Sequence, residues 1–314
     1  MPELPEVEHV VRALRRVVVG RRIVATEIGL RKLILPLSRS VFNRKLKGSK
    51  ITSVGRRGKF ILIELEPSGD LPHRPHPSRT ARLGASGRAS DISVGGSPQK
   101  LAGQALVLVV HLRMTGKFLY LTADDILPKH GHAIFYLDND RRLVFADQRQ
   151  FGVMKLVSVG RLIKTRGISE LAPEPFSDDF SSDYLKATLA RSRRTLKTLL
   201  LDQTRVLGLG NIYAAEALFR AGINPFKSAA TLSSRRTERL HQAILDVLRD
   251  AIADSSTSRV DLERPNGFSY GEAFERFWQV YEREGEPCVN CGARIRRIVH
   301  GGRSTYWCPN CQRK

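Results

Sequence analysis

The chain has 314 residues, with 52 Lys or Arg against 31 Asp or Glu, so its formal net charge is +21. This length suits two domains with a small appendage, and a hydrophobic fraction of 41% excludes a wholly disordered chain. No apolar run approaches the roughly 18 residues of a membrane span, and the acidic start is unlike a signal peptide, so we expect a cytoplasmic protein that does not enter the membrane.

The positive charge favours a polyanion as partner, because neutralising phosphates releases counterions and supplies affinity that is independent of sequence. An anionic membrane is the competing partner. We find no basic amphipathic helix or lipidation motif, so nucleic acid is the preferred interpretation.

The first residues can carry covalent chemistry. Removal of Met1 would leave Pro2 with a free secondary amine, and the pKa of an α-amino group, about 7.7–8.0, keeps part of it neutral and nucleophilic at neutral pH. Such an amine can attack an electrophilic carbon and form an iminium (Schiff-base) intermediate. The neighbouring Glu3 can donate or accept a proton. The alternative is that Pro2 merely begins the chain.

A helix followed by a mainly β domain is predicted for the first half of the chain. Apolar residues at helical spacing predict the helix over residues 7–19, with Gly20 as its stop. Lys59 begins one strand, and its ordinary interpretation is a surface lysine. Met114 follows another strand, and its ordinary interpretation is a core residue. The expected strands are 23–30, 51–54, 59–65, 105–110, 133–137, 142–146 and 152–157.

Residues 67–103 interrupt this pattern. Of these 37 residues, 17 are Pro, Gly or Ser, and the apolar ones follow no sustained period. The composition predicts a disordered or loosely ordered insertion of basic character, and a functional loop is the alternative.

A polar loop over residues 147–152 carries one aromatic side chain. Phe151 stands close to Arg149, and an exposed Phe beside an Arg can wedge into a base stack, as minor-groove binders do. Alone, this signal is weak.

Helical periodicity replaces strand periodicity after a linker at residues 158–180. The glycine-rich turn 207–213 lies between two predicted helices, close to Lys197 and Arg205. Its glycines allow a close backbone approach, and the following helix N-terminus favours an anion, so we expect a seat for a backbone phosphate. The expected helices are 184–190, 195–201, 213–221, 233–253 and 270–281, with a polar stretch at 255–266.

All four cysteines fall near the end of the chain and have the spacing of a zinc ribbon. They form two Cys-x2-Cys pairs, and four thiolates leave no open coordination position, so the metal would fold the segment without doing chemistry. A hairpin over residues 294–307 would join the pairs and present a basic ridge. The expected zinc ligands are Cys288, Cys291, Cys308 and Cys311, and the ridge holds Arg294, Arg296, Arg297, His300 and Arg303.

Three of these motifs together resemble the bacterial formamidopyrimidine-DNA glycosylase family. The start reads Pro-Glu-Leu-Pro-Glu-Val-Glu (residues 2–8), the glycine-rich turn reads Gly-Leu-Gly-Asn-Ile-Tyr (208–213), and the ribbon ends Tyr-Trp-Cys-Pro-Asn-Cys (306–311). The resemblance covers nearly the whole chain except residues 67–103.

The resemblance implies an α+β multidomain fold. Residues 1–160 would form a catalytic β-sandwich with a leading helix and the flexible insertion 67–103, residues 161–286 a helical helix-two-turn-helix domain, and residues 287–314 the zinc finger. It further implies one structural zinc ion, a monomer, a cytoplasmic location at the nucleoid, and double-stranded DNA with oxidised bases or abasic sites as partner.

A bifunctional glycosylase and abasic-site lyase follows from the resemblance. Pro2 would attack C1′ of the damaged nucleotide, displacing 8-oxoguanine or a formamidopyrimidine, and β,δ-elimination would then cut the strand. Glu3 would transfer protons, Glu6 would support the site, and Lys59 would contact the lesion or its phosphate. The extruded nucleotide would be replaced by Met114, Arg149 and Phe151, and the DNA would further contact His132, Lys197, Asn211 and Arg303.

Some positions depart from the family pattern. Gln148 and Gln150 replace a proline and an arginine of its wedge loop, and residues 258–270 differ from its lesion-capping loop. The sister enzyme endonuclease VIII, which removes oxidised pyrimidines, is one alternative, although Leu4 and the Arg-x-Phe pair disfavour it. A non-catalytic DNA-binding homologue is another, disfavoured by the intact acidic and basic candidates.

Overall fold

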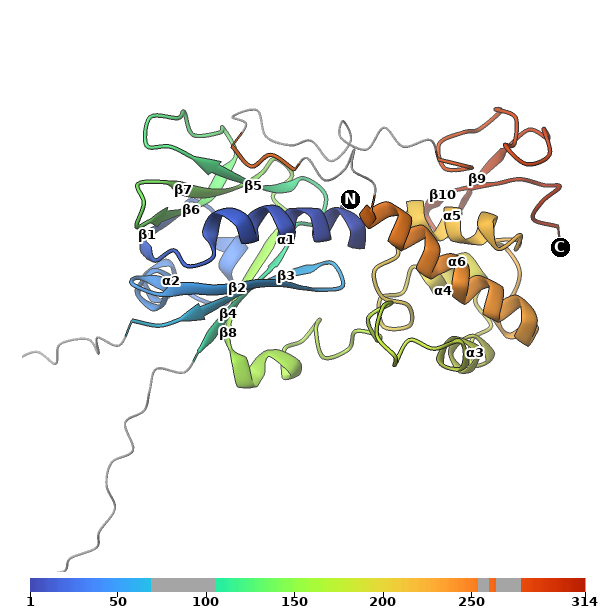
Figure 1. The fold of residues 1–314 in the computed structure, drawn as a ribbon, viewed down its shortest axis with the longest axis horizontal. Helices are drawn as coiled ribbons and strands as arrows, with labels where there is room; N and C mark the ends of the chain where they lie inside the picture. The colour runs from blue at the N-terminus through green and yellow to red at the C-terminus, as the bar shows by residue number, and fades with distance from the viewer. Residues whose placement is uncertain (69–104, 254–259, 264–277, 314) are drawn as a thin grey trace, which may run out of the picture.

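The computed structural model spans residues 1–314 and describes residues 1–68, 105–253, 260–263 and 278–313. Figure 1 shows two lobes side by side: a β lobe, and a helical lobe that also carries a small hairpin near the C-terminus. The first helix runs through the β lobe and points its N-terminal end at the helical lobe. The predicted insertion, apart from its first two residues, and most of the predicted helix 270–281 lie outside the described residues.

The β lobe is built from two four-stranded antiparallel sheets. One has the order β1-β6-β7-β5 and the other β2-β3-β4-β8, and buried side chains of both sheets share one hydrophobic core. The strands are β1 Ile23–Ile28, β2 Lys50–Arg57, β3 Phe60–Glu66, β4 Leu106–His111, β5 Gly116–Leu121, β6 Gly131–Leu137, β7 Arg142–Asp147 and β8 Val153–Ser158. The expected sandwich is confirmed.

Helix α1, Leu4–Val18, packs along β2 and begins three residues earlier than predicted. Glu3 is its N-cap and forms a capping box with Glu6, and Pro5 suits the first turn because the amide it lacks has no partner there. Two functional candidates are therefore also the residues that start the helix.

Besides the 3-10 helix Arg31–Ile34, one helix and one strand of the β lobe were not predicted. Helix α2, Arg39–Leu46, is short and buries only Phe42 and Leu46, with Ser38 accepting the N–H of Val41 as its cap. Strand β5 follows the β4–β5 turn directly, and no element was predicted there from the sequence. Two buried residues in eight leave too weak a period to separate a helix from a loop.

The helical lobe contains α3 Ser182–Ala190, α4 Leu196–Leu200, α5 Asn211–Arg220, α6 Ser234–Ala253 and the short 3-10 helix Ala229–Thr231. Two further 3-10 helices, Arg31–Ile34 and Val159–Lys164, lie elsewhere in the chain. The hairpin pairs β9 Arg296–His300 with β10 Arg303–Trp307. Leu4 is fully buried in the core of this lobe and not in that of the β lobe. The start of α1 is thus held by the opposite lobe.

A second tie between the lobes lies at the β2–β3 turn. Glu174 accepts the N–H of Gly58 at 2.6 Å and pairs with Arg56 at 2.6 Å and with Arg57 at 3.3 Å. A side chain at Gly58 would meet Leu207 of the helical lobe at 2.4 Å, and its φ of +54° also favours glycine. The turn that carries Lys59 is therefore tightly placed.

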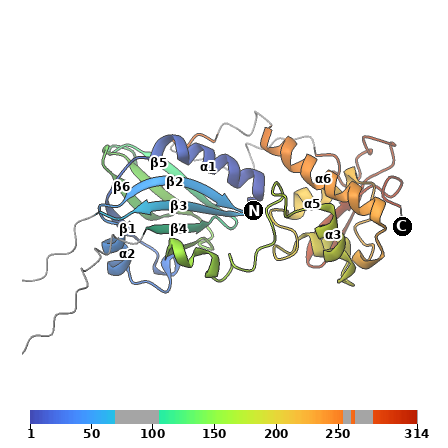
Figure 2. The same cartoon turned by 60° about the horizontal axis from the view of Figure 1, so that its bottom comes forward.

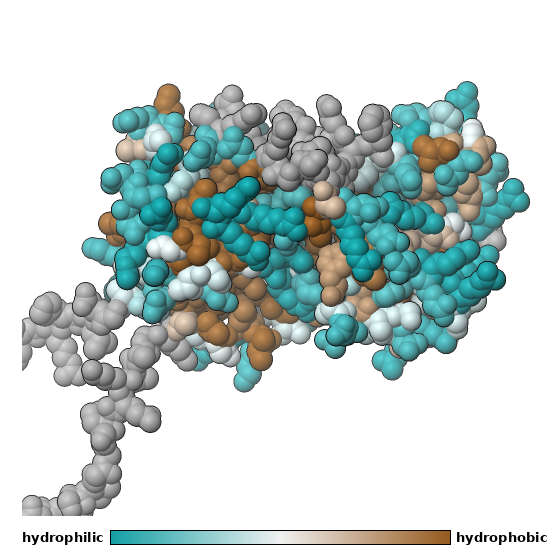
Figure 3. Space-filling model, viewed as in Figure 1, coloured by the Kyte–Doolittle hydropathy of each residue, from teal (hydrophilic) through white to brown (hydrophobic). Residues whose placement is uncertain are grey.

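Figure 3 shows mostly hydrophilic residues over the helical lobe on this face, with hydrophobic residues gathered mainly on the β lobe. Within the described residues, no helix combines the length and the apolar character that a membrane crossing requires.

Candidate active site and nucleic-acid interface

The glycine-rich turn of the helical lobe binds the side chain of Glu3. The carboxylate accepts the N–H of Gly210 at 2.5 Å, of Ile212 at 2.9 Å and of Tyr213 at 3.3 Å. These amides lie at the N-terminus of α5, where the exposed N–H groups and the helix dipole favour an anion. The expected anion seat therefore exists, but a carboxylate of the same chain occupies it.

Glycine is required at two positions of this turn. A Cβ at Gly210 would lie 2.3 Å from Cδ of Glu3, and one at Gly208 would lie 2.5 Å from Cδ1 of Leu4. Gly208 also has a φ of +90°, and its carbonyl accepts the N–H of Leu4 at 3.1 Å. The two glycines therefore allow the backbone of the helical lobe to contact the side chains at the start of α1.

Glu6 is buried behind Glu3. Its carboxylate accepts the N–H of Glu3 at 2.7 Å and the hydroxyl of Tyr213 at 2.6 Å. Burial, followed by the charge of Glu3, raises the pKa of Glu6 to about 6. Glu6 can thus hold or release a proton near neutral pH.

Lys59 is only 4% exposed, so the interpretation as a surface lysine was wrong. Its ammonium donates to the carbonyl of Leu209 at 2.6 Å, and Gln203 braces the same turn by donating to that carbonyl and accepting the N–H of Gly208. Burial lowers the pKa of Lys59, while Glu3 and Glu6 oppose that shift. An ammonium that loses its proton more readily than a free lysine is suited to proton transfer.

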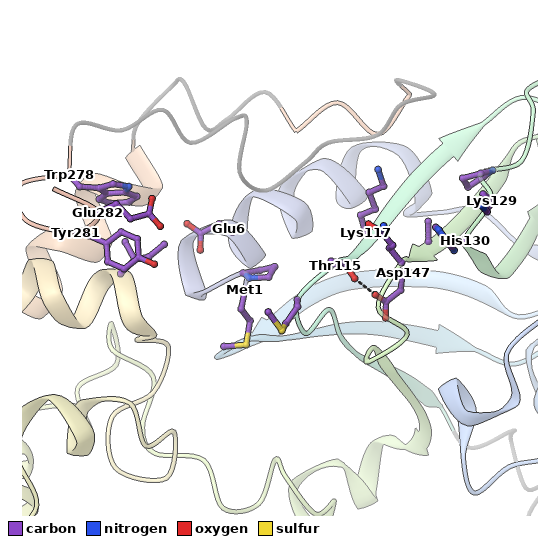
Figure 4. Close-up of a pocket in the computed structure, with 16 residues that line it drawn as sticks. Met1, Glu6, Thr115, Lys117, Lys129, His130, Asp147, Trp278, Tyr281 and Glu282 are labelled. Atoms are coloured by element: carbon purple, nitrogen blue, oxygen red, sulfur yellow. Dashed lines mark hydrogen bonds between the residues drawn. The ribbon is translucent and has the colours of Figure 1, made fainter. Parts of the chain in front are cut away.

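A cavity of about 510 Å³ lies between the lobes, with Pro2 and Glu6 on its wall. Figure 4 shows Trp278, Tyr281 and Glu282 on the side of the helical lobe, and Thr115, Lys117 and Asp147 on the side of the β lobe. Burial raises the pKa of Tyr281 to about 12, so its phenol remains a donor at neutral pH. The candidate nucleophile, aromatic side chains and hydrogen-bonding groups therefore line the same cavity, as is common for ligand sites.

The loop over residues 147–152, here called the aromatic loop, reaches the wall of this cavity opposite the helical lobe. Hydrogen bonds to Asp147 hold it in place. This buried carboxylate accepts the hydroxyl of Thr115 and, at 2.7 Å, the N–H of Gly152. The guanidinium of Arg149 lies over the ring of Phe151, 5.2 Å from its centroid. Arg149 and Phe151 are both exposed, as a wedge requires.

Met114 is 40% exposed and lines the cavity, so the interpretation as a core residue was wrong. Its replacement of the extruded nucleotide stays a prediction. The turn that presents it is shaped by His111, whose Nδ1 accepts the N–H of Arg113 at 3.0 Å. Burial lowers the pKa of His111 to about 3, so the ring stays neutral and can keep this bond.

His132 contributes indirectly in this structure. Its Nε2 lies 2.9 Å from the carbonyl oxygen of Asp147, so the ring supports the aromatic loop, whereas His130 lines the cavity. Direct DNA contact by His132 stays a prediction. His130 and Lys129 were not singled out from the sequence, because nothing in their spacing marks them.

Lys197 and Asn211 both bind the hairpin of the zinc finger. Their side-chain nitrogens donate to the carbonyl of Ser304 at 2.6 and 3.0 Å, next to the exposed Arg303. Burial, followed by Arg303, lowers the pKa of Lys197 to about 8. The structure brings the three residues together, with Lys197 buried and with Lys197 and Asn211 holding the hairpin in place. Phosphate binding by these residues stays a prediction.

The four cysteine Sγ atoms lie within 4.8 Å of one another. The distance from Cys288 to Cys311 is 3.8 Å and that from Cys291 to Cys308 is 3.5 Å. Ligands about 2.3 Å from a tetrahedral zinc ion stand about 3.8 Å apart, so this donor set fits one zinc ion. The expected structural zinc site is confirmed.

Sequence reasoning missed several residues that complete the site. Tyr213 was read only as part of a motif, and Gln203, Ser304 and Trp278 were not singled out. Ser304 and Trp278 contact partners distant in sequence. Gln203 bonds the nearby Gly208 and Leu209, but no residue pattern signals that contact. The position of Tyr213 at the end of the glycine-rich turn was the one signal that the sequence offered.

Three family models match the chain in order. They are described as the formamidopyrimidine-DNA glycosylase N-terminal domain (residues 1–154), the formamidopyrimidine-DNA glycosylase H2TH domain (171–261) and a zinc finger found in FPG and IleRS (285–313). A curated relative from Pelotomaculum thermopropionicum, named formamidopyrimidine-DNA glycosylase, is 40% identical over 313 residues, which cover 100% of this chain and 99% of the relative.

Solved structures agree with these matches. A Lactococcus lactis formamidopyrimidine-DNA glycosylase, non-covalently bound to DNA with an abasic site, superposes with a TM-score of 0.78 at 31% identity and covers 99% of this chain and 100% of its own. A structure described as MutM in complex with DNA containing carbocyclic 8-oxo-G gives 0.77 at 32% identity, with full coverage of both chains at 100%.

Proposed function

The chain belongs to the formamidopyrimidine-DNA glycosylase family, and we propose that it is a bifunctional DNA glycosylase and abasic-site lyase. It excises oxidised purines from duplex DNA and then cuts the strand. The observation that carries this proposal is the position of Pro2 at the wall of the interdomain cavity, with Glu3, Glu6 and Lys59 buried around it.

The nucleophile is the amine of Pro2 after removal of Met1. It attacks C1′ of the damaged nucleotide, the glycosidic bond breaks, and the bonding electron pair leaves with the base, which takes up a proton. Opening of the sugar ring gives an iminium between Pro2 and C1′. Loss of a C2′ proton then expels the 3′ phosphate, and a second elimination expels the 5′ phosphate.

The buried acids and Lys59 handle the protons of these steps. Glu3 lies beside Pro2 in the chain and is held at the N-terminus of α5, so its carboxylate is fixed near C1′. Glu6, with a pKa of about 6, supports Glu3 from behind. Lys59, whose pKa is lowered by burial, can supply a proton to a leaving oxygen.

Extrusion of the nucleotide precedes this chemistry, because the target carbon is inaccessible within a stacked duplex. Met114, Arg149 and Phe151 fill the space that the nucleotide leaves. Unstacking and unpairing require a few kcal/mol, and inserted side chains return part of it. Lys197, Asn211 and Arg303 bind the backbone phosphates beside the lesion. The zinc ion, when bound, holds the hairpin that carries Arg303.

The alternatives from the sequence are less well supported. The matching N-terminal model and the named relatives belong to the formamidopyrimidine enzyme and not to endonuclease VIII. A non-catalytic homologue would have no need to keep three buried ionisable groups beside Pro2, because burial of such groups is costly. We further propose that the enzyme works as a monomer in the cytoplasm, where bacterial DNA is located.

Borohydride trapping on a duplex with 8-oxoguanine opposite cytosine tests the proposal. Reduction of the iminium should give a stable protein–DNA adduct, and peptide mass spectrometry should locate it on Pro2 of protein that lacks Met1. Protein that retains Met1 is the matched control and should give no adduct. An adduct on a lysine, or one formed only with an oxidised pyrimidine, would contradict the assignment.

A further inference from the structure

A strongly basic surface lies on the β lobe, outside the cavity. Between Glu27 and Glu64 the sequence contains no acidic residue. Six basic residues of this stretch are exposed, and we call them the α2 basic face. Its members are Arg31, Lys32, Arg39, Arg44, Lys45 and Lys47.

The fold brings these residues together on one side of the lobe. Helix α2 packs against β1 and against the 3-10 helix Arg31–Ile34 that carries Arg31 and Lys32. Phe42 and Leu46 lie one turn apart and are fully buried, so Arg44 stands on the opposite, outward side of α2. Lys45 and Lys47 lie on either side of it.

The nearby acids do not neutralise this face. In β1, Thr26 points at α2 and donates to Asn43, so Glu27, the next residue along the strand, points away. Glu66 lies directly opposite Lys50 across the β2–β3 ladder, and that pair forms the boundary of the basic face. Among the ion pairs of the described residues, none includes a member of the α2 basic face.

This face is remote from the reaction site. Figures 1 and 2 both show α2 at the end of the β lobe that lies away from the N-terminus and the helical lobe. None of its six residues lines the cavity. A duplex held between the lobes therefore leaves the α2 basic face available.

We propose that the α2 basic face is a second binding site for double-stranded DNA, one that contacts backbone phosphates without reading bases. Six exposed cations without paired carboxylates match the charge of a phosphate backbone. A membrane surface fits less well, because Phe42 and Leu46 of α2 are fully buried and a membrane-binding helix inserts its apolar face. Such a site lets the enzyme hold a neighbouring DNA segment while the cavity processes a lesion. This second site adds to the proposed function. It rests on that function only because the test requires a lesion duplex bound in the cavity.

The test uses enzyme whose cavity is already filled. The borohydride adduct with a lesion duplex is purified, and binding of a short, labelled, undamaged duplex to it is measured by fluorescence anisotropy at about 50 mM salt and above. We expect binding that weakens steeply with salt, since each phosphate contact contributes about −0.9 to the slope of log K against log salt. Replacing Arg44, Lys45 and Lys47 by Gln together should weaken it about tenfold or more.

The matched control removes three positive charges from α6 through Arg235→Gln, Arg236→Gln and Arg239→Gln, and it should leave binding within about twofold of wild type. The yield of the adduct checks that each variant is folded. If the triple variant of α2 is not folded, the single variant Arg44→Gln is used in its place. Equal binding by the α2 variant and wild type, no second duplex on the wild-type adduct, or binding of phosphatidylserine vesicles in place of DNA would each overturn the proposal.

If no adduct forms at all, the proposed function fails. The second site is then tested by counting duplexes per free chain in the ultracentrifuge, where two are expected for wild type and one for the α2 variant.

Discussion

The carboxylate of Glu3 and the backbone of Gly210 are in direct contact across the two lobes, with the Gly210 amide donating to Oε2 at 2.5 Å. The residues stand 207 positions apart in the chain. Glu3 is the N-cap of α1, and Gly210 is the N-cap of α5, so one carboxylate joins the starts of two helices. The position of the candidate nucleophile relative to the helical lobe depends on this contact.

Gly210→Ala should therefore disable the enzyme and weaken the fold. The added Cβ would stand 2.3 Å from Cδ of Glu3, which must move. We expect a loss of about 2 kcal/mol in the free energy of unfolding and about 100-fold in single-turnover excision, because misplacement by an ångström has effects of that size. Gly160→Ala, where nothing lies within 4 Å, is the control and should change unfolding by less than about 0.5 kcal/mol. An active Gly210→Ala enzyme would show that the contact is dispensable.

Glu6 should make stability depend on pH in a defined window. Its pKa is raised from 4.5 to about 6 in the folded state, so folding favours the protonated form. Its contribution is complete below pH 4.5 and is lost as pH rises through 6. The stability difference between wild type and Glu6→Gln should therefore fall by about 2 kcal/mol between acidic and neutral pH, as measured by urea unfolding.

Tyr213→Phe provides the companion measurement for Glu6. The Tyr213 hydroxyl donates to Glu6 and favours its ionised form, so its removal should raise the pKa of Glu6 further. The pH dependence of unfolding should then grow relative to wild type. An unchanged dependence would mean that the Tyr213 hydroxyl does not affect the pKa of Glu6, and a smaller one that it favours the protonated form.

Phe151→Ala should slow excision from paired duplex DNA by about tenfold or more, because the vacated stack loses its aromatic filler. The defect should be smaller when the lesion faces a mismatched base, which is already easier to extrude. Phe176→Ala is a close control, since Phe176 is 41% exposed against 52% for Phe151 and also has an arginine, Arg249, over its ring. Equal defects in the two variants would argue against a wedge.

Zinc removal should abolish tight DNA binding and leave the β lobe folded. Without the metal, the hairpin would no longer hold Ser304 against Lys197 and Asn211, and Arg303 would lose its place. We expect Cys308→Ser to bind lesion duplex about 100-fold more weakly in anisotropy titrations and to contain no zinc by elemental analysis. Returning zinc to chelated wild type should restore binding. Tight binding by a metal-free protein would show that the hairpin is not needed.

Local spacing was sufficient for much of the assignment. Two Cys-x2-Cys pairs predict a zinc site because the ligands of each pair are neighbours in the chain, and Pro2 with Glu3 predicts amine chemistry for the same reason. The long strands and helices were also predicted, since each shows several periods of buried residues. Helix α2 was missed because Phe42 and Leu46 are its only buried residues, which is too few to show a helical period. Strand β5 was also missed, although it is as long as β4 and β7.

The tertiary structure decided what could not be local. Lys59 is buried although a lysine is ordinarily exposed, and Met114 is exposed although a methionine is ordinarily buried. Burial depends on which segment of the chain packs over a side chain, and the sequence does not show this. The raised pKa of Glu6 likewise depends on its burial between the two lobes and on the nearby charge of Glu3. The sequence determined which groups capable of chemistry are present. Only the packing of the helical lobe against the start of α1 decided how they meet, because those contacts join residues some 200 positions apart.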